Sequence, residues 1–282
     1  MPLLEKKLYR NTLKQFTEYT DFCNPHDIIE SWDGALTLIQ ENLEAGIKGL
    51  RSPQLGAIYA ALAHWSYSNT IATVVMPTGT GKTETMLSVL IQTQCPKLLV
   101  IVPTDPLREQ IAKKFISLGL LKQFNILNHN ALHPIVGILK TRFSNAEEAS
   151  DFISKCNVVV TTASWLSGLP PDVFKVFTDS FTSVFIDEAH HAEATTWFGI
   201  RDKFKDKKVL QFTATPYRND GKKSKAEIIY SYPLRKAQQE GYFKKIEFIP
   251  FMNTSLAKPI TQSQQQQLRF YEKIESFTRT SY

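Results

Sequence analysis

The feature that most constrains this chain is a stretch of eight residues, MPTGTGKT, at positions 76–83. It follows a short apolar, β-branched run from Ile71 to Val75 and opens a helical stretch that begins at Lys82. Gly79 and Gly81 let the backbone curl so that its N–H groups face one point, and the helix start adds a dipole that favours an anion. A strand, a glycine-rich turn and a helix in this order predict a phosphate-binding loop.

The loop predicts a role for each of its polar residues. Lys82 is expected to reach the β- and γ-phosphates of a nucleotide, and the Thr83 hydroxyl is expected to bind Mg²⁺. Met76 replaces the first glycine of the usual GxxxxGK[ST] pattern. A glycine-rich turn without a ligand is the alternative, and the flanking elements disfavour it. The expected nucleotide contacts within the loop are Thr78, Gly79, Thr80, Gly81, Lys82 and Thr83.

A pair of carboxylates follows another apolar run, in the sequence VFIDEAHH at 184–191. Open α/β sheets bind ligands at the carboxyl ends of their strands, where Asp187 and Glu188 are expected to lie. Asp187 would hold Mg²⁺ through water, and Glu188 would position and deprotonate an attacking water. The alternative is an acidic pair at the start of the following helix. The upstream phosphate loop favours the catalytic interpretation, with Lys82, Asp187 and Glu188 as the catalytic residues.

Short apolar runs alternate with helical stretches through most of the chain, which is typical of a parallel sheet covered on both faces. The expected class is a three-layer α/β fold with a mostly parallel sheet. Residues 1–50 are expected to be helical, because apolar residues between Leu36 and Ile47 recur at helical spacing. The further strands are expected at 98–102, 135–139, 158–161, 184–186 and 209–212, with a later strand at 246–251 and helices at 105 onward, 146–155 and 234–240.

Charge and cysteine content narrow the setting. The net charge of +6 suits a polyanionic partner. The three cysteines include no CxxC pair, so neither a disulfide framework nor a zinc site is expected. The sequence has no apolar stretch long enough for a signal peptide or a membrane span, and a cytoplasmic protein without a membrane partner is expected.

Four motifs, MPTGTGKT, PTDPLREQ, DEAH and TATP, occur in an order that resembles superfamily 2 helicases of the DEAD/DEAH type. Tyr217 and Arg218 follow TATP, which resembles the branch of restriction-enzyme motor subunits and UvrB-like proteins. The resemblance covers residues 51 to about 250 and implies a RecA-like domain that uses ATP and Mg²⁺. The expected organisation is a helical segment at 1–50, the ATP-binding helicase domain at 51–232, and a linker with the start of a truncated second domain at 233–282.

The resemblance also implies roles for residues outside the loop. Gln54, supported by Arg51, would read adenine; the alternative is an ordinary helix start with Pro53 in its first turn. PTDPLREQ and VVVTT resemble motifs that contact the nucleic-acid backbone, and TATP resembles the motif that links the ATP state to strand binding. The implied nucleic-acid contacts are Thr104, Arg108, Thr161 and Thr162, and the implied coupling residues are His190, Thr213 and Thr215.

The implied function is an ATP-hydrolysing DNA helicase or translocase, with DNA favoured over RNA and with protein partners in a restriction or phage-defence complex. A module that binds nucleic acid or a partner and is switched by nucleotide is the alternative. A P-loop ATPase acting on protein is disfavoured by TATP and PTDPLREQ. No HExxH pattern supports a transition-metal site at His190 and His191 or at His129 and His133. The chain is expected to be incomplete and to hydrolyse ATP poorly alone, because a second domain normally supplies an arginine finger.

Overall fold

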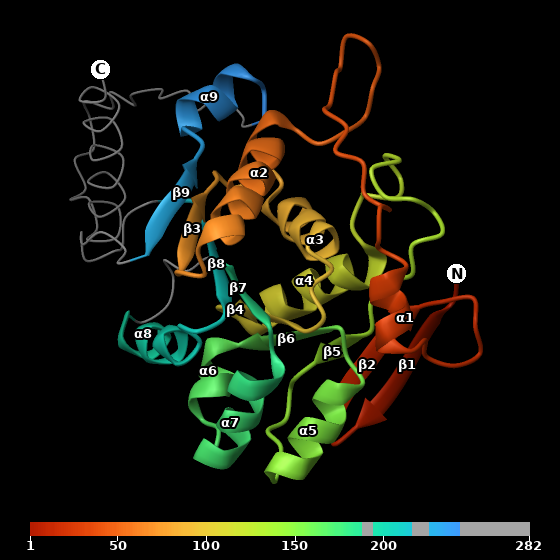
Figure 1. Ribbon diagram of the computed structural model, residues 1–282, viewed down its shortest axis with the longest axis vertical. Coiled ribbons are helices and arrows are strands. Elements are labelled where there is room, and N and C mark those ends of the chain that lie inside the picture. The colour runs from red at the N-terminus through yellow and green to blue at the C-terminus, as the bar shows by residue number, and fades with distance from the viewer. Residues whose placement is uncertain (188–193, 216–225, 243–282) are drawn as a thin grey trace, which may run out of the picture. The chain divides into compact units, whose positions relative to one another are not determined.

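The computed structural model describes residues 1–187, 194–215 and 226–242, all within the compact unit Met1–Lys244 (Figure 1). Nine strands of this unit form one sheet in the order β1-β2-β5-β6-β4-β7-β8-β3-β9. The strands are β1 (Leu3–Leu8), β2 (Asn11–Phe16), β3 (Ala72–Val75), β4 (Leu98–Val102), β5 (Val136–Ile138), β6 (Val158–Thr162), β7 (Ser183–Asp187), β8 (Lys208–Thr213) and β9 (Glu227–Ser231).

The sheet is mostly parallel. Strands from β5 to β9 in the sheet order pair in parallel, whereas β1 with β2 and β2 with β5 pair antiparallel. The central strands β3, β4, β6 and β7 are buried along their whole length, as their Val- and Ile-rich sequences require.

Helices cover the sheet on both faces. Figure 1 shows α2, α3 and α4 on one side and α5, α6 and α7 on the other. Helices α2, α4 and α7 each carry proline in their first turn, where the missing N–H is harmless. The expectation of a three-layer α/β fold is confirmed. The helices are α1 (Pro25–Glu30), α2 (Ser52–Tyr67), α3 (Lys82–Gln92), α4 (Asp105–Ser117), α5 (Ala146–Ser154), α6 (Ala163–Ser167), α7 (Pro171–Ser180), α8 (Ala194–Lys203) and α9 (Leu234–Gln239).

The expectation of a helical segment over residues 1–50 is wrong. Its start is the hairpin β1–β2, which extends the main sheet through β5, and its one described helix is α1. Residues 36–50 fold back on themselves instead: Gln40 bridges Leu50, and a Cβ on Gly49 would lie 2.6 Å from the Ile39 carbonyl oxygen. The apolar spacing was misleading because Leu43 is 77% exposed and does not belong to a buried helix face.

The chain near residue 230 also differs from expectation. β9 (Glu227–Ser231) was not expected, yet it pairs with β3 at the sheet edge. Its side chains are exposed or half-buried, so the sequence lacks the apolar run that marks the inner strands. Helix α9 lies where a helix was expected, whereas the strand expected at 246–251 lies outside the described residues.

Candidate nucleotide-binding site

Five parallel strands bring the sequence motifs to one edge of the sheet. In the order β6-β4-β7-β8-β3, the register pairs Val102 with Thr162, Ile101 with Ile186, Asp187 with Phe212, and Val75 with Thr213. Neighbouring strands therefore end at nearly the same level of the sheet, and a motif lies at or just after the end of each strand. The carboxyl edge of the sheet is therefore the candidate site, as expected for an open α/β fold.

The phosphate loop leaves β3 at this edge and enters α3. Gly79 and Gly81 have φ values of 85° and 95°, which other residues rarely adopt. Gly81 is the N-cap of α3, so the curl and the helix start coincide. Thr80 is buried and its hydroxyl donates to the Pro77 carbonyl at 2.7 Å, which pins the turn from within. The loop thus has the backbone shape of an anion cradle.

Met76, where the loop pattern usually has glycine, is buried. Its Sδ lies 3.9 Å from the Thr85 hydroxyl of α3. The Met76 N–H donates to the Thr213 carbonyl at 2.9 Å, which ties the loop to the end of β8. The methionine therefore fills core space beneath the loop, whereas Thr78 and Gly79 are exposed.

Lys82 and Thr83 open α3 half-buried, and Asp187 ends β7 with 5% of its surface exposed. β8 lies between β3 and β7, so the strand that leads into the loop and the strand that ends in Asp187 are not neighbours. Two strand spacings separate them by about 10 Å. A metal-bound phosphate can bridge that span, since Lys82 and Thr83 follow β3 by a loop that reaches out from the edge.

Arg51 and Gln54 brace this loop. Arg51 is the N-cap of α2, and its Nη1 donates to the Gly79 carbonyl at 2.8 Å. The Gln54 Oε1 accepts from the Arg51 N–H at 2.7 Å, and its Nε2 donates to the Gly81 carbonyl at 3.2 Å. The bond from the Arg51 N–H to Gln54 is the half of a capping box that the third helical residue supplies, since the arginine side chain cannot accept a hydrogen bond in return.

The candidate nucleic-acid contacts lie farther along the same edge, after β4. Thr104 is the exposed N-cap of α4, and its side chain makes no capping bond. Arg108 is 6% exposed, and its Nη1 pairs with Asp105 Oδ1 at 2.8 Å. The Arg108 Nε is buried without a hydrogen-bond partner in the described part of the chain. Thr104 thus lies open at the edge, whereas Arg108 lies beneath it.

Thr161 and Thr162 end β6, the next strand along. Both are buried, and the Thr162 hydroxyl accepts from the Trp165 N–H, which caps α6. The Thr161 hydroxyl is buried without a hydrogen-bond partner among the residues that the structure describes. Neither side chain faces solvent at this edge.

Two of the three residues expected to couple the sites, Thr213 and Thr215, lie at the end of β8. The Thr213 hydroxyl donates to the Thr215 carbonyl at 2.9 Å and accepts from the Thr215 N–H at 3.3 Å. This closed turn follows β8, the strand that separates the loop from Asp187. Glu188 and His190 lie outside the described residues.

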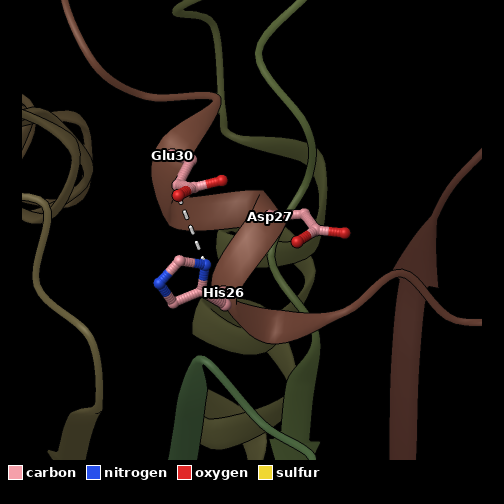
Figure 2. Close-up of side chains that lie close together, drawn as sticks. All are labelled: His26, Asp27 and Glu30. Atoms are coloured by element: carbon pink, nitrogen blue, oxygen red, sulfur yellow. Dashed lines mark ion pairs between the residues drawn. The ribbon is translucent and has the colours of Figure 1, made fainter.

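One group of metal-binding residue types and one buried histidine are also candidate metal ligands. His26, Asp27 and Glu30 gather on α1, where His26 Nδ1 lies 3.5 Å from Glu30 Oε1 (Figure 2). All three are exposed, and a surface ion pair on a short helix accounts for them. His133 is instead buried, with its Nδ1 2.9 Å from the Ile116 carbonyl, and burial followed by the nearby Lys122 lowers its pKa to about 4. We assign His133 a packing role.

No helix in the described ranges has both the length and the apolar character needed to cross a membrane.

Solved structures of helicases and restriction enzymes have a related fold. A nuclease-deletion mutant of the type ISP restriction-modification enzyme LlaGI, solved with a DNA substrate mimic, is 19% identical, with a TM-score of 0.48 over 69% of this chain and 21% of that one. The UvsW helicase from bacteriophage T4 is 16% identical, with a TM-score of 0.46 over 77% of this chain and 69% of that one. The helicase domain of Pyrococcus furiosus Hef is 23% identical, with a TM-score of 0.38 over 56% and 33%.

The chain spans about a fifth of the length of LlaGI. No curated protein sequence matches the chain. The family model described as "Type III restriction enzyme, res subunit" matches residues 47–218, which is well over half of the 282 residues and includes all four motifs. The chain therefore belongs to the type III restriction enzyme res subunit family, and it carries a superfamily 2 helicase motor domain.

Proposed function

We propose that this chain is the ATP-binding motor domain of a nucleic-acid-dependent ATPase, a DNA helicase or translocase of a restriction or phage-defence system. The observation that carries the proposal is the common edge of the sheet. There the curled loop of Gly79 and Gly81 follows β3, and the buried Asp187 ends β7. These two parallel strands are separated by one strand, β8. A triphosphate seated on the loop would carry its magnesium toward Asp187.

Each residue has a definite task in this proposal. Loop N–H groups and Lys82 hold the phosphates, because they present positive charge at a helix start. Thr83 and Asp187 hold Mg²⁺, which withdraws charge from the γ-phosphate when it is bound. Glu188 positions the attacking water, and His190, Thr213 and Thr215 relay the nucleotide state to the nucleic-acid contacts.

The nucleic-acid contacts belong to the other half of the edge. Thr104 is open to a phosphate, and Arg108 would reach one once its pair with Asp105 is exchanged for it. Thr161 and Thr162 would act through the strand end that they shape, since both side chains are buried. DNA is favoured over RNA because the res subunit family belongs to restriction systems, whose substrate is DNA.

Binding of ATP with and without Mg²⁺ tests the nucleotide half. Lys82→Ala removes a cation from the phosphates and should weaken ATP binding about ten- to a hundredfold. Asp187→Asn should instead remove the gain in affinity that Mg²⁺ gives. Lys175→Ala and Asp179→Asn are matched controls, because these exposed residues of α7 pair with each other at 2.7 Å, away from the loop. An unchanged response to Mg²⁺ in Asp187→Asn would refute the assigned metal site.

ATP turnover with and without single-stranded DNA or RNA tests the nucleic-acid half. We expect slow turnover by this chain even with DNA, a rate that DNA raises more than RNA of the same sequence, and loss of that increase in Glu188→Gln while ATP still binds. A rate that neither polymer changes would contradict a motor and favour the nucleotide-switched binding module.

A further inference from the structure

The last described segment of the chain returns to the phosphate loop. β9 pairs with β3 in parallel, and the Tyr232 N–H donates to the Val75 carbonyl at 2.9 Å. Helix α9 follows, and the Tyr242 N–H closes its end by donating to the Ala237 carbonyl at 2.9 Å. The Tyr242 carbonyl oxygen then lies 3.7 Å from the position that a Cβ on Gly79 would take. Tyr242 is thus fixed beside the loop by structure that the motifs do not include.

The Tyr242 ring meets the residue that braces the loop. The Arg51 guanidinium carbon lies 5.0 Å from the centroid of the ring, and the same guanidinium donates to the Gly79 carbonyl at 2.8 Å. Arg51 and Tyr242 are both half-buried, and Gly79 is exposed. A flat cation and a flat ring therefore lie together beside the exposed Gly79 of the loop.

Gln54, the residue expected to read adenine, is differently placed. It is 5% exposed, and both ends of its amide are already bonded, to the Arg51 N–H and to the Gly81 carbonyl. With 5% of its surface exposed, Gln54 offers a base little contact area, and its two bonds hold the start of α2 and the loop in place. The Arg51–Tyr242 pair beside the loop is half-buried and offers a partly open π surface.

We propose that Tyr242, together with Arg51, is the stacking platform for the base of the bound nucleotide, and that Gln54 is a positioning residue for the loop. The inference rests on the proposed nucleotide-binding function and identifies how the base is held there. Stacking accepts any base, because every base has a π face. The platform therefore favours base-bearing triphosphates over inorganic ones and discriminates weakly between ATP and GTP.

The test measures binding of three ligands with Mg²⁺ to the 282-residue chain: ATP, GTP and inorganic tripolyphosphate. Tyr242→Ala should weaken ATP and GTP about tenfold each, the usual scale for losing a base–aromatic stack, and tripolyphosphate less than about twofold. Tyr242→Phe keeps the ring and should retain wild-type affinity for all three. Tyr59→Ala is the matched control, since Tyr59 is 56% exposed on α2.

The outcomes separate the platform from the proposed function. If Tyr242→Ala weakens all three ligands equally, or if Tyr242→Phe is as weak as Tyr242→Ala, the platform is wrong. If Lys82→Ala binds ATP and tripolyphosphate as tightly as the wild type does, the proposed function itself fails. Urea unfolding of Tyr242→Ala checks that the loss is local, and a wild-type midpoint with selective loss of ATP and GTP supports the platform.

Discussion

The chain leaves the strands in two different ways at the two halves of the carboxyl edge. After β3, the chain turns through two positive-φ glycines and presents backbone, with Thr78 and Gly79 exposed. After β4 and β6, the chain goes directly into helices, and the motif side chains of Arg108 and Thr162 are buried. The nucleotide half is built from backbone, whereas the nucleic-acid half is built from helix starts.

This difference changes what a motif residue means. Two positive-φ glycines between the end of a buried strand and the start of a helix give the curl that suits an anion, so the loop is best explained by a ligand. A threonine at a helix start has a structural use of its own, and Thr162 is engaged in it. The two halves should therefore respond to mutation differently, through ligand affinity in the first and through stability in the second.

The largest effect that would sharpen this comparison is expected from Gly81→Ala. A Cβ there would lie 2.8 Å from Gln54 Cδ, and the φ of 95° is strained for alanine. We expect ATP affinity to fall at least about tenfold, because the cradle must open, with a loss of about 1–3 kcal/mol of unfolding free energy from backbone strain. Isothermal titration with ATP and urea unfolding measure the two quantities.

Gly46→Ala is the matched control for that change. Its φ of 69° is also positive, but no atom of the described residues lies within 4 Å of the added Cβ. It should therefore lose stability from strain alone and keep wild-type ATP affinity. If the two variants bind ATP equally well, the loop curl does not matter for binding, and the contrast between the halves breaks down.

A smaller effect is expected from Gln54→Ala, which removes one hydrogen bond at the start of α2 and one from α2 to the loop. We expect a loss of about 1–2 kcal/mol in unfolding free energy and a few-fold weaker binding of both ATP and tripolyphosphate. Gln54→Glu keeps the acceptor for the Arg51 N–H but places a carboxylate against the Gly81 carbonyl, so it should be worse than alanine for anions. A loss confined to ATP would show instead that Gln54 reads the base.

The sequence predicted the elements whose residue types are typical of one kind of structure. The inner strands, the loop and its helix follow from buried β-branched runs and from glycines before Lys82, and these expectations match the described fold. The strands β2 and β9 were missed because they take their places by pairing with the distant strands β5 and β3, and β1 is held to the sheet only through β2. The apolar residues of β9 form a run of only three, Ile228 to Tyr230, and β1 and β2 carry charged or polar residues throughout.

The site shows the same limit at the level of single residues. Tyr242 lies in no motif, and it reaches Arg51 only because β9 and α9 carry it back across the sheet edge. The one-strand gap between the loop and Asp187 also depends on strand order, which the sequence does not state. Part of the role of Gln54 could have been expected, because a glutamine at the third helical position commonly accepts from the N–H of the residue that precedes the helix.

The smallest effects come from the two threonines that begin helices in the nucleic-acid half. Thr162→Val removes the bond to the Trp165 N–H and should cost about 1 kcal/mol of unfolding free energy. Because its hydroxyl is buried, DNA affinity at fixed salt should stay within about twofold of wild type. Thr104→Val should do the reverse, since Thr104 is exposed and makes no capping bond.

For Thr104→Val we expect stability within about 0.5 kcal/mol of wild type and DNA binding a few-fold weaker, because valine cannot donate a hydrogen bond to a phosphate oxygen. Urea unfolding and DNA binding at a single salt concentration are measured on both variants. Thr162→Val should lose stability and keep DNA affinity, and Thr104→Val should keep stability and lose DNA affinity. A loss of DNA affinity in Thr162→Val at unchanged stability would mean that β6 opens on binding. The nucleic-acid half would then present its side chains to the ligand as directly as the phosphate loop presents its backbone.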